Sequence, residues 1–497
     1  MSAITAHAQS RTRPRLSPRA ALGLVLAAKV VVTLATDSRY GWHRDELYYV
    51  ATGRHLAFGY VDFPSVTPVL ARVSHALFGD SLVGLRVLPL IAGVGVVALT
   101  VLMARELGGG PRAQLVAGLA LVTSSFFLGA DALFQPVPFD QLTWALCLYV
   151  LVRLVLRGNE HTWIAFGAAV GVAFWTKYTI IALLAAVAVG YLATGARSQL
   201  RSRGPWLAAI VALAIAAPNI AWQATHHWAS IDFLRRQNAE VRKDYPPPRY
   251  VIEQIVALGP VVLALSIVGF RRLWRSEQLR PLAWLGPVVV LWYLVLRGKS
   301  YYPLTVYPVL VAAGAVAVEE KGRSVRAWTI ALVIGGLVAL PATLPVLPLD
   351  TAIRAHIVDG RDDWKEELGW RELVRTTAMV FDRLPAADRA RAVILGRSYS
   401  DAGAVDLFGP RYGLPRAYSG HNTYWWWGPP PDGARPVIAV GFAGRRLLDR
   451  YLVGCARAAT LDNRHHVDNM ERGWGVWVCD GPRASWSATW PRLRAYG

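Results

Sequence analysis

The segment "YGWHRDELYYVATGRHLAFGYVDFPSVTP", residues 40–68, carries an adjacent Asp45–Glu46 pair and lies between two long apolar runs. Apolar residues recur in it at roughly helical spacing with aromatic residues between them, a pattern typical of an amphipathic helix lying along a membrane surface. The two acids would open this helix at its positive end, which favours ionised carboxylates. Helix capping explains one of them and explains the second less well. We therefore expect a functional role for one acid of the pair.

The composition indicates a membrane protein, because the 497 residues are 54% hydrophobic and only 17% charged, with 20 Trp. A formal net charge of +20 in a soluble protein would suggest nucleic-acid binding. Here the Arg residues punctuate apolar runs, so they indicate membrane topology and contacts with anionic lipid or phosphate. The basic start "RTRPRLSPRA" resembles that of a signal peptide, but no clear cleavage site follows, and we predict a retained first helix.

Apolar stretches long enough to cross about 30 Å of hydrocarbon recur along the chain. They predict about eleven transmembrane helices, near residues 18–36, 83–104, 113–130, 138–156, 161–176, 178–194, 205–222, 250–270, 281–296, 301–318 and 326–347.

Short basic connections predict the orientation of these helices. Arg-rich loops such as "ARELGGGPR" and "GARSQLRSRG" fall between alternate helices, and short basic loops stay cytoplasmic. The N-terminus is therefore expected in the cytoplasm, and an odd number of helices places everything after about residue 348 outside. The same alternation puts the 37–82 loop, the 131–137 turn, Lys177, the 223–249 loop and residues 297–302 together on the outer face.

Two ionisable residues at membrane depth are candidates for function, because such groups are expensive there and usually face a cavity. Asp140 lies at the outer mouth of the fourth helix, and Lys177 lies between two apolar segments. Each has an alternative structural role. Asp140 in "PFDQ" suits a helix N-cap, and Lys177 suits an anchor whose ammonium reaches the membrane surface.

The composition changes abruptly near residue 349. "RAVILGRSYSDAGAVDLFG" and "RPVIAVGFAGRRLLDRYL" each predict a strand, a turn and a helix, and "WGVWVCD" predicts a further strand. We expect a cytoplasmic basic tail over 1–17, a membrane domain over 18–348 and an extracytoplasmic α/β domain over 349–497. Cys455 and Cys479 both fall in this exterior domain, where a disulfide between them is permitted.

Five ordered motifs carry a resemblance to a known family: "DELYYVATGRHLAFGYVDFP", "FQPVPFDQL", "WTKYT", "APNIAWQATHHWASIDF" and "GKSYYPLTVYPVLVAAGAV". Over roughly residues 20–320 the chain resembles the superfamily of bacterial membrane glycosyltransferases with the GT-C fold, which includes aminoarabinose transferases and protein O-mannosyltransferases. The resemblance implies an α-helical polytopic enzyme of the plasma membrane. Such an enzyme takes a sugar from a polyprenyl-phosphate carrier on the extracytoplasmic face and passes it to a lipid, a cell-wall glycan or a protein.

The resemblance also implies roles for particular residues. Asp45 matches the acidic residue of the first outer loop that acts as catalytic base, with Asp140 as its competitor. Glu46 is expected to be structural, orienting the loop helix or pairing with Arg44 or Lys299. Basic and aromatic residues near the membrane surface are expected to hold the donor phosphate: Lys177, Lys299, Arg86 and Tyr302. The acceptor or sugar is assigned to Asp62, His226, His421, Asn422 and Trp426.

This division of labour is chemically consistent. Inverting transfer needs one carboxylate to deprotonate the acceptor hydroxyl while cations stabilise the leaving phosphate on the opposite face.

In the C-terminal region, "YSGHNTYWWWGPPPDG" combines three Trp with amide and imidazole groups. This combination suits stacking on a sugar, and it equally suits packing of a loop against the membrane domain.

Other chemistries have weaker signals. No glycine-rich nucleotide loop, HExxH or CxxC pair occurs. No metal ligands are assigned and no cofactor is required, although "THHW" at 225–228 could contribute to a divalent metal site with Asp62 or Asp232. The alternative function is a transporter or flippase of a lipid-linked or anionic solute, but the sequence shows no internal helix repeat of the kind that many carriers have.

Overall fold

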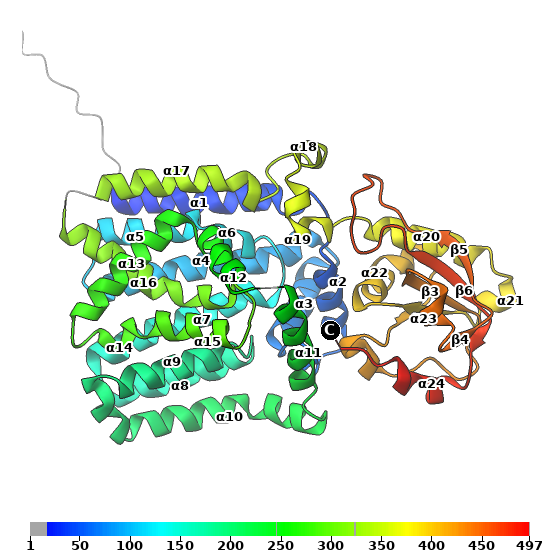
Figure 1. Cartoon of the computed structure of the whole chain (residues 1–497), viewed down its shortest axis with the longest axis horizontal. Helices are drawn as coiled ribbons and strands as arrows, with labels where there is room; N and C mark the ends of the chain where they lie inside the picture. Colours follow the sequence, from blue (N-terminus) through cyan, green and yellow to red (C-terminus); the bar gives the residue numbers. More distant parts are fainter. Residues whose placement is uncertain (1–16, 245, 323–324, 497) are drawn as a thin grey trace, which may run out of the picture.

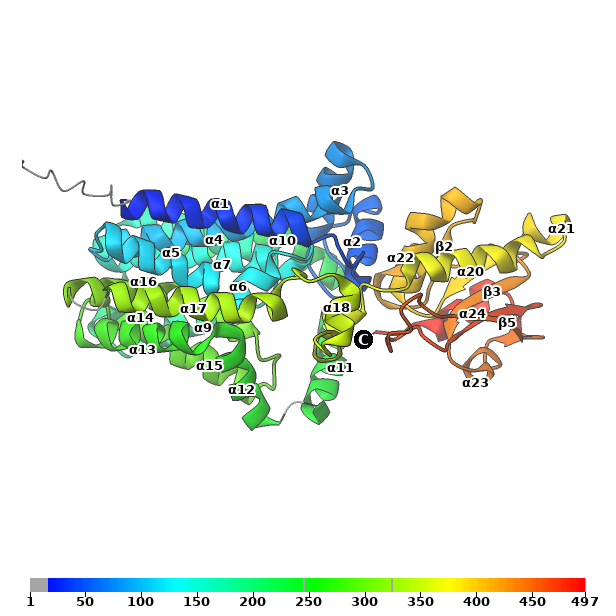
Figure 2. The same ribbon diagram turned by 90° about the horizontal axis from the view of Figure 1, so that it is seen from above.

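The computed structural model describes residues 17–244, 246–322 and 325–496. A bundle of helices occupies one half of the molecule and a region built on a β-sheet occupies the other (Figures 1 and 2). Most of the predicted cytoplasmic tail, residues 1–16, lies outside the described residues.

Within the described residues, six helices are long and apolar enough to cross a membrane: α1 (Pro18–Thr36), α4 (Leu82–Glu106), α7 (Pro136–Arg157), α10 (Gly204–Thr225), the continuous run of η2 (Tyr302–Val306) and α16 (Tyr307–Glu320), and α17 (Val325–Thr343). Two helix pairs bent by 111° and 97° raise this to eight if each pair is one span: α9 (Ile180–Leu192) with η1 (Gly195–Arg201), and α12 (Pro247–Leu258) with α13 (Pro260–Arg275). The shorter bundle helices are α5 (Pro111–Thr123), α6 (Ser125–Ala130), α8 (Glu160–Phe174), α14 (Arg280–Ala283) and α15 (Leu285–Val295).

All eleven apolar stretches predicted from the sequence are helical, but the predicted count of eleven membrane spans is not confirmed. The reason is that several stretches are broken or short. The 113–130 stretch breaks at Ser124 between α5 and α6, and the 250–270 stretch bends sharply at Gly259 and Pro260. Proline at the start of α13 lacks a backbone N–H, so it can begin a helix but cannot continue the preceding one.

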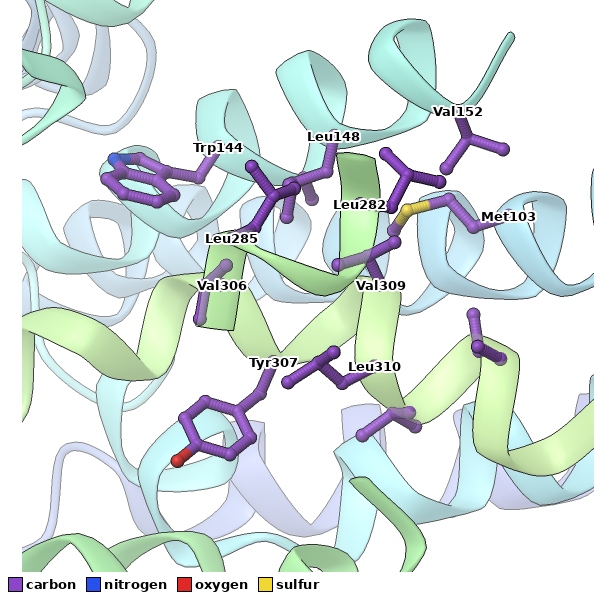
Figure 3. Packing of buried hydrophobic residues seen from close by; sticks show 14 of the residues in the cluster. Met103, Trp144, Leu148, Val152, Leu282, Leu285, Val306, Tyr307, Val309 and Leu310 are labelled. Carbon is purple, nitrogen blue, oxygen red and sulfur yellow. The ribbon is translucent and has the colours of Figure 1, made fainter. Parts of the chain in front are cut away.

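Close backbone contacts between small residues hold the bundle together. A Cβ built on Gly269 of α13 would lie 1.9 Å from the backbone oxygen of Leu310, and one on Gly314 of α16 would lie 2.2 Å from that of Leu265. These glycines therefore let α13 and α16 approach backbone to backbone, as is common in membrane proteins. Large apolar side chains fill the adjoining space between α4, α7, α14, α15 and α16, including Trp144, Leu148, Leu282, Leu285 and Val309 (Figure 3).

The segments predicted to share the outer face meet at one end of the bundle. Here lie α2 (Arg44–Arg54), α3 (Val66–Phe78), α11 (Ala229–Asp244), α18 (Leu349–Arg354), η3 (Val358–Gly360) and α19 (Asp362–Lys365). The backbone N–H of Val66 donates to the carbonyl of Trp175 at 3.1 Å, which ties the first outer loop to the turn before Lys177. The predicted clustering on one face of the bundle is thus confirmed, whichever side of the membrane this face occupies.

Helix α2 forms where the periodicity predicts it, and a capping box begins it. Its surroundings differ from the prediction of a helix lying along the membrane surface. Leu47, Tyr48 and Ala51 are buried, and α22 (Tyr399–Phe408) from the far end of the chain packs against α2. The aromatic residues that suggested a lipid contact instead pack against protein.

The C-terminal region contains a five-stranded sheet in the order β2-β1-β3-β6-β5. Strand β1 (Val393–Gly396) runs parallel to β2 (Ala417–Tyr418) and β3 (Val437–Phe442), while β6 (Gly475–Cys479) is antiparallel to β3 and β5 (Ala456–Thr460). A separate pair joins β4 (Leu452–Val453) and β7 (Gly481–Pro482). The remaining elements are α20 (Trp370–Asp382), α21 (Ala386–Arg389), η4 (Gly409–Tyr412), η5 (Asn422–Trp427), α23 (Arg445–Leu448) and α24 (Trp486–Leu493). This is the predicted α/β region, and Cys455 and Cys479 form the predicted disulfide.

Candidate active site

Asp45 lies in the first turn of α2, with a side chain that is 29% exposed. Its Oδ1 accepts a hydrogen bond from the Tyr399 hydroxyl at 2.7 Å, so the first outer loop and the C-terminal region meet at this carboxylate. Burial would raise the pKa of Asp45, but the charges of His43 and Arg44 outweigh it and lower the pKa below its usual value. Lys299 also contributes to lowering the pKa of Asp45, which places its ammonium within electrostatic range.

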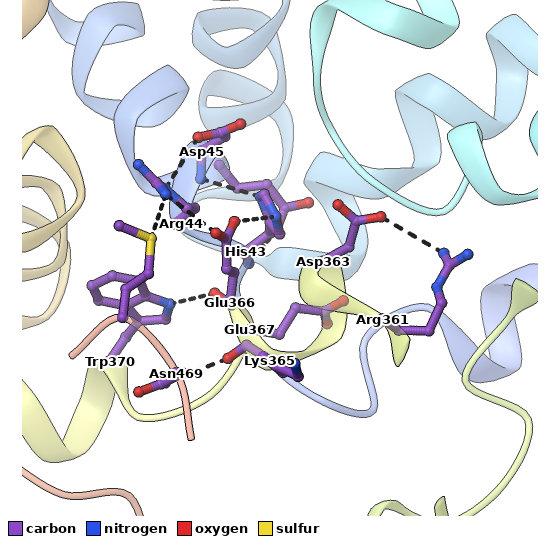
Figure 4. Close-up of polar contacts among 12 residues, drawn as sticks. His43, Arg44, Asp45, Arg361, Asp363, Lys365, Glu366, Glu367, Trp370 and Asn469 are labelled. Carbon is purple, nitrogen blue, oxygen red and sulfur yellow. Dashed lines mark hydrogen bonds and ion pairs between the residues drawn. The ribbon is translucent and has the colours of Figure 1, made fainter. Parts of the chain in front are cut away.

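A polar network fixes the start of α2 (Figure 4). Arg44 donates to the Tyr399 hydroxyl at 3.0 Å and to Glu366 at 3.2 Å, and His43 Nε2 lies 3.3 Å from the same glutamate. Burial alone would lower the pKa of His43, but its hydrogen bond to Glu366 and the nearby acids raise it to about 9. The Arg44 guanidinium also lies 3.7 Å from Asp45 Oδ1, so positive charge adjoins this carboxylate.

Glu46 points away from Asp45 and is fully buried. Its two carboxylate oxygens each accept from Arg86 at 2.7 Å, and they also accept from the backbone N–H groups of Phe134 and His43 at 2.9 Å. The structural role expected for Glu46 agrees with this geometry, but the predicted partners, Arg44 and Lys299, are wrong. The partner is Arg86, because the helix turns Glu46 inward toward α4.

The structure does not support the assignment of Arg86 to the donor phosphate. Its guanidinium is buried and donates to Glu46, to the carbonyls of Asp37 and Gly41, and to Glu367 at 3.5 Å. Each of its three nitrogens donates inside the protein and the side chain is fully buried, so the guanidinium is not presented to a ligand.

Lys177, Lys299 and Tyr302 come together as expected. The Lys177 ammonium lies 4.4 Å from the centre of the Tyr302 ring and 5.4 Å from that of Tyr301, and Lys299 lies 5.9 Å from the Tyr301 ring. Within the described part of the chain, neither ammonium lies within 4 Å of a carboxylate oxygen. Neither lysine forms an ion pair with a carboxylate in this part of the chain, so the two ammonium groups form a site of positive charge that an anion can neutralise.

Asp140 lies deeper, in α7, and both of its oxygens accept from the Thr179 hydroxyl, at 2.7 and 2.9 Å. The Asp140 and Lys177 charges are close enough to interact. Asp140 is the fifth residue of α7, beyond the position of an N-cap, so the capping alternative is wrong.

The five residues assigned to an acceptor or sugar lie where the outer loops meet the C-terminal region. Asp62 accepts from the Tyr48 hydroxyl at 2.9 Å and from the Asn422 amide at 3.0 Å, and His421 stacks on Tyr399 at 4.9 Å. Burial raises the pKa of Asp62 to about 7 despite the hydrogen bond from Tyr48.

His226 and Trp426 form a second group in the same zone. The His226 ring stacks on Trp222 at 3.9 Å, and its centre lies 4.7 Å from that of Trp426. His226 Nδ1 lies 2.8 Å from the carbonyl of Trp222, so this nitrogen is occupied. Across the described residues, no group of three or more His, Cys, Asp or Glu side chains could hold a metal ion.

Sequence reasoning missed Tyr399 and Tyr48, which connect the site. Their rings stack at 4.4 Å, Tyr399 donates to Asp45, and Tyr48 donates to Asp62. Tyr48 lies in the 40–68 segment, one helical turn after Asp45. Residues at this spacing lie on the same side of a helix, so the sequence could have indicated that Tyr48 is near the site. Tyr399 lies in the C-terminal region with no motif around it, and nothing local connected it to Asp45.

Comparisons with known proteins agree with this architecture. Residues 62–222 match the family described as dolichyl-phosphate-mannose-protein mannosyltransferase. Over 92% of its length the chain superposes on the crystal structure of ArnT from Cupriavidus metallidurans bound to undecaprenyl phosphate, with a TM-score of 0.58, 15% identity and 97% of that chain covered. The chain therefore has the fold of this ArnT structure.

Two curated relatives are similar to this chain over most of its length. An undecaprenyl phosphate-alpha-4-amino-4-deoxy-L-arabinose arabinosyl transferase of Pseudomonas fluorescens is 24% identical over 66% of this chain, and a lipid A galacturonosyltransferase of Rhizobium johnstonii is 25% identical over 59%. The matches cover 62% and 64% of these relatives, which is less than two thirds of their length.

Proposed function

We propose that this protein transfers a sugar from a polyprenyl-phosphate donor, of the undecaprenyl phosphate type, to a lipid, cell-wall glycan or protein acceptor. The observation that carries the proposal is the position of Asp45, whose carboxylate lies within electrostatic range of the Lys299 ammonium. Lys299 belongs to the same cluster as Lys177 and Tyr302. A carboxylate on one side and two lysines on the other are the groups that such a transfer needs. The names of the superfamily relatives point to the same class of reaction.

Asp45 acts as the base in this proposal. Its lowered pKa keeps it ionised at neutral pH, so it can accept the proton of an acceptor hydroxyl as that oxygen attacks the sugar. The bond from the sugar to the carrier phosphate breaks on the opposite face, and the configuration inverts. Tyr399 orients the carboxylate through its hydrogen bond, leaving the second oxygen, Oδ2, to meet the acceptor.

Lys177 and Lys299 bind the phosphate. The negative charge on the leaving phosphate grows as the bond to the sugar breaks, and fixed cations stabilise that charge without a proton donor. Tyr301 and Tyr302 border the two ammonium groups and would shield them from bulk water. Asp62, His226, His421, Asn422 and Trp426 would then contact the acceptor or the sugar.

The reaction is assigned to the extracytoplasmic face. Two observations support this side: the Cys455–Cys479 disulfide, since disulfides persist in oxidising compartments, and the basic loops at the opposite end of the helices. No specific observation favours a transporter or flippase over a transferase.

Asp45→Asn tests the proposal directly. Purified protein in detergent is given a panel of radiolabelled polyprenyl-phospho-sugars together with membrane lipid extract as acceptor. Loss of a general base typically lowers the rate by about 10²–10⁴. We expect Asp45→Asn to lose transfer while donor binding persists, and Lys177→Met to bind the donor more weakly.

Asp359→Asn is the matched control, since this exposed acid lies in η3 at the same end of the bundle and pairs with His356 at 2.8 Å. It should transfer at the wild-type rate. If Asp45→Asn keeps near-normal turnover with saturating donor while Asp140→Asn loses it, the roles assigned to Asp45 and Asp140 are reversed. Movement of labelled donor across proteoliposomes without any transfer would support the flippase instead.

A further inference from the structure

A cleft of about 270 Å³ lies at the opposite end of α2 from Asp45, where that helix meets the C-terminal region. Residues from three places line it: the end of α2, the segment from α22 to β2, and η5. The lining side chains with polar or aromatic groups are Arg54, His55, Asp406, Arg416, Tyr418, Tyr424 and Trp427. None of them has a role in the transfer proposed above.

The cleft is positively charged. Arg416 is exposed and uses Nε and Nη2 to donate to the Tyr418 hydroxyl, at 3.0 and 2.8 Å. Over the described ranges, no carboxylate oxygen lies within 4 Å of its guanidinium. Burial and then the charges of Arg416 and Arg54 lower the pKa of His55, so both guanidinium groups act on this imidazole. An anion entering the cleft would meet Arg416 and a neutral histidine, with Arg54 beside them in an ion pair with Asp80 at 3.4 Å.

Flat aromatic surfaces adjoin this charge. His55 stacks on Trp427 with ring centres 4.2 Å apart, and Tyr424 lies 4.4 Å from Trp427. Arg416 lies over the Tyr418 ring at 4.4 Å. A small inorganic anion gains nothing from such surfaces, whereas a ring with an apolar face can pack on them.

A carboxylate in the same cleft points to a ligand with hydroxyl groups. Asp406 accepts from the backbone N–H of Ala417 and from the Tyr424 hydroxyl, both at 2.8 Å, and each oxygen retains a further lone pair. An anion alone would be repelled by this group. A ligand that carries both an anion and hydroxyl donors would be attracted by the arginines and could donate to Asp406.

We propose that the cleft binds an anionic saccharide, a sugar ring carrying a phosphate or carboxylate group. The anion lies against Arg416, because a guanidinium group binds either anion in a bidentate manner, and the charge of Arg54 lies nearby. The ring packs on Trp427, and a hydroxyl donates to Asp406.

The position of the cleft relates it to the reaction. Arg54 follows Asp45 by nine residues on one helix, which corresponds to about 14 Å at 1.5 Å per residue. If the proposed transfer is correct, the cleft would hold a remote part of a glycan or glycolipid acceptor whose hydroxyl reaches Asp45. This connection rests on the proposed function, while the binding itself does not.

Isothermal titration of the full chain in detergent tests the proposal with four probes: glucose 6-phosphate, glucuronate, glucose and inorganic phosphate. The titrations use the Lys177→Met background, so that the donor phosphate site contributes little. We expect one or both of the anionic sugars to bind at least tenfold more tightly than glucose and inorganic phosphate. The stronger of the two identifies the preferred anionic group.

Arg416→Gln should weaken that binding about tenfold, the effect of losing a charge-assisted hydrogen bond. Arg416→Lys should retain part of it. Arg411→Gln is the matched control, because Arg411 is an exposed arginine of the adjacent η4 that does not line the cleft. It should bind like the parent.

Three results would overturn the proposal: equal binding by the Arg416→Gln and parent proteins, glucose binding as tightly as the anionic sugars, or inorganic phosphate binding as tightly as glucose 6-phosphate. The titration involves no transfer, so its failure would leave the proposed function standing. Likewise, if the Asp45→Asn assay contradicted the proposed function, the titration would still decide whether the cleft binds an anionic saccharide.

Discussion

At the scale of single residues, Asp45 and Glu46 show how adjacent carboxylates acquire different roles. Successive helical residues point about 100° apart, so only one of the pair can face the lysines. Glu46 faces inward to Arg86 in a fully buried ion pair, and Asp45 faces Tyr399. The same helix therefore presents one structural and one accessible acid.

Glu46→Gln should destabilise the fold strongly. The change leaves the Arg86 charge buried without its main partner, and breaking a buried pair typically costs about 3–5 kcal/mol. The measurement is thermal unfolding in detergent, with Asp45→Asn as the neighbouring control that should melt close to the wild type. Equal melting temperatures for Glu46→Gln and wild type would remove the structural role of this pair.

Asp62 should make stability depend on pH. Its pKa is raised to about 7 from 3.8, so the folded protein holds this proton more tightly than the unfolded chain. The stabilising contribution is fully present below pH 3.8 and is lost as the pH rises through 7. Asp62→Asn should therefore lose less stability than wild type between pH 5 and pH 8, as followed by thermal melting. An unchanged pH dependence in this variant would contradict the assignment.

The sequence could predict which loops meet better than which side chains contact one another. The proximity of Lys177 and Tyr302 was foreseen because each lies beside an apolar segment on one face of the bundle, while their roles stay predictions. The pairing of Glu46 with Arg86 was not foreseen, since Arg86 lies inside the next apolar run and offered no local sign of an inward carboxylate. Tyr399 follows Asp45 by 354 residues, and no periodicity relates positions so far apart.

At the scale of helices, two glycines determine how closely α13 and α16 pack. Gly269→Ala should destabilise the bundle by about 1–3 kcal/mol, because the added methyl group meets the backbone of Leu310 rather than a movable side chain. Gly335→Ala is the control, since in α17 the added Cβ would lie no closer than 3.9 Å to Val261. Thermal unfolding of the two variants provides the comparison, and similar melting temperatures would show that the contact is not limiting.

The apolar content of the sequence predicted where the helices lie, but it did not predict where each helix ends. Apolar composition marks each stretch, but Ser124 and the Gly259–Pro260 step end helices within a stretch that remains apolar throughout. A break of this kind depends on tertiary packing and on a missing backbone N–H, neither of which alters hydropathy. The same limit explains α2, whose apolar residues predicted burial correctly but could not distinguish lipid from protein as the neighbour.

At the scale of the whole molecule, the α/β region and the outer loops lie at one end of the bundle, and the basic loops predict that this end faces outside (Figure 1). A reporter enzyme that works only after export, fused to the C-terminus, should therefore be active. A reporter that works only in the cytoplasm should be inactive at the same position. Activity of the cytoplasmic reporter would place the α/β region, and the proposed reaction with it, on the inner face.

The hydrogen bond from Tyr399 to Asp45 has a consequence for biosynthesis. The two residues are 354 positions apart, and ribosomes add about 5–20 residues per second. Helix α2 therefore leaves the ribosome about 18–70 s before α22, the helix that begins with Tyr399 and covers α2. During that interval the aromatic face of α2 lacks its cover and the carboxylate lacks its hydroxyl partner. A nascent chain should thus depend on chaperones or lipid to shield α2 until α22 has been synthesised.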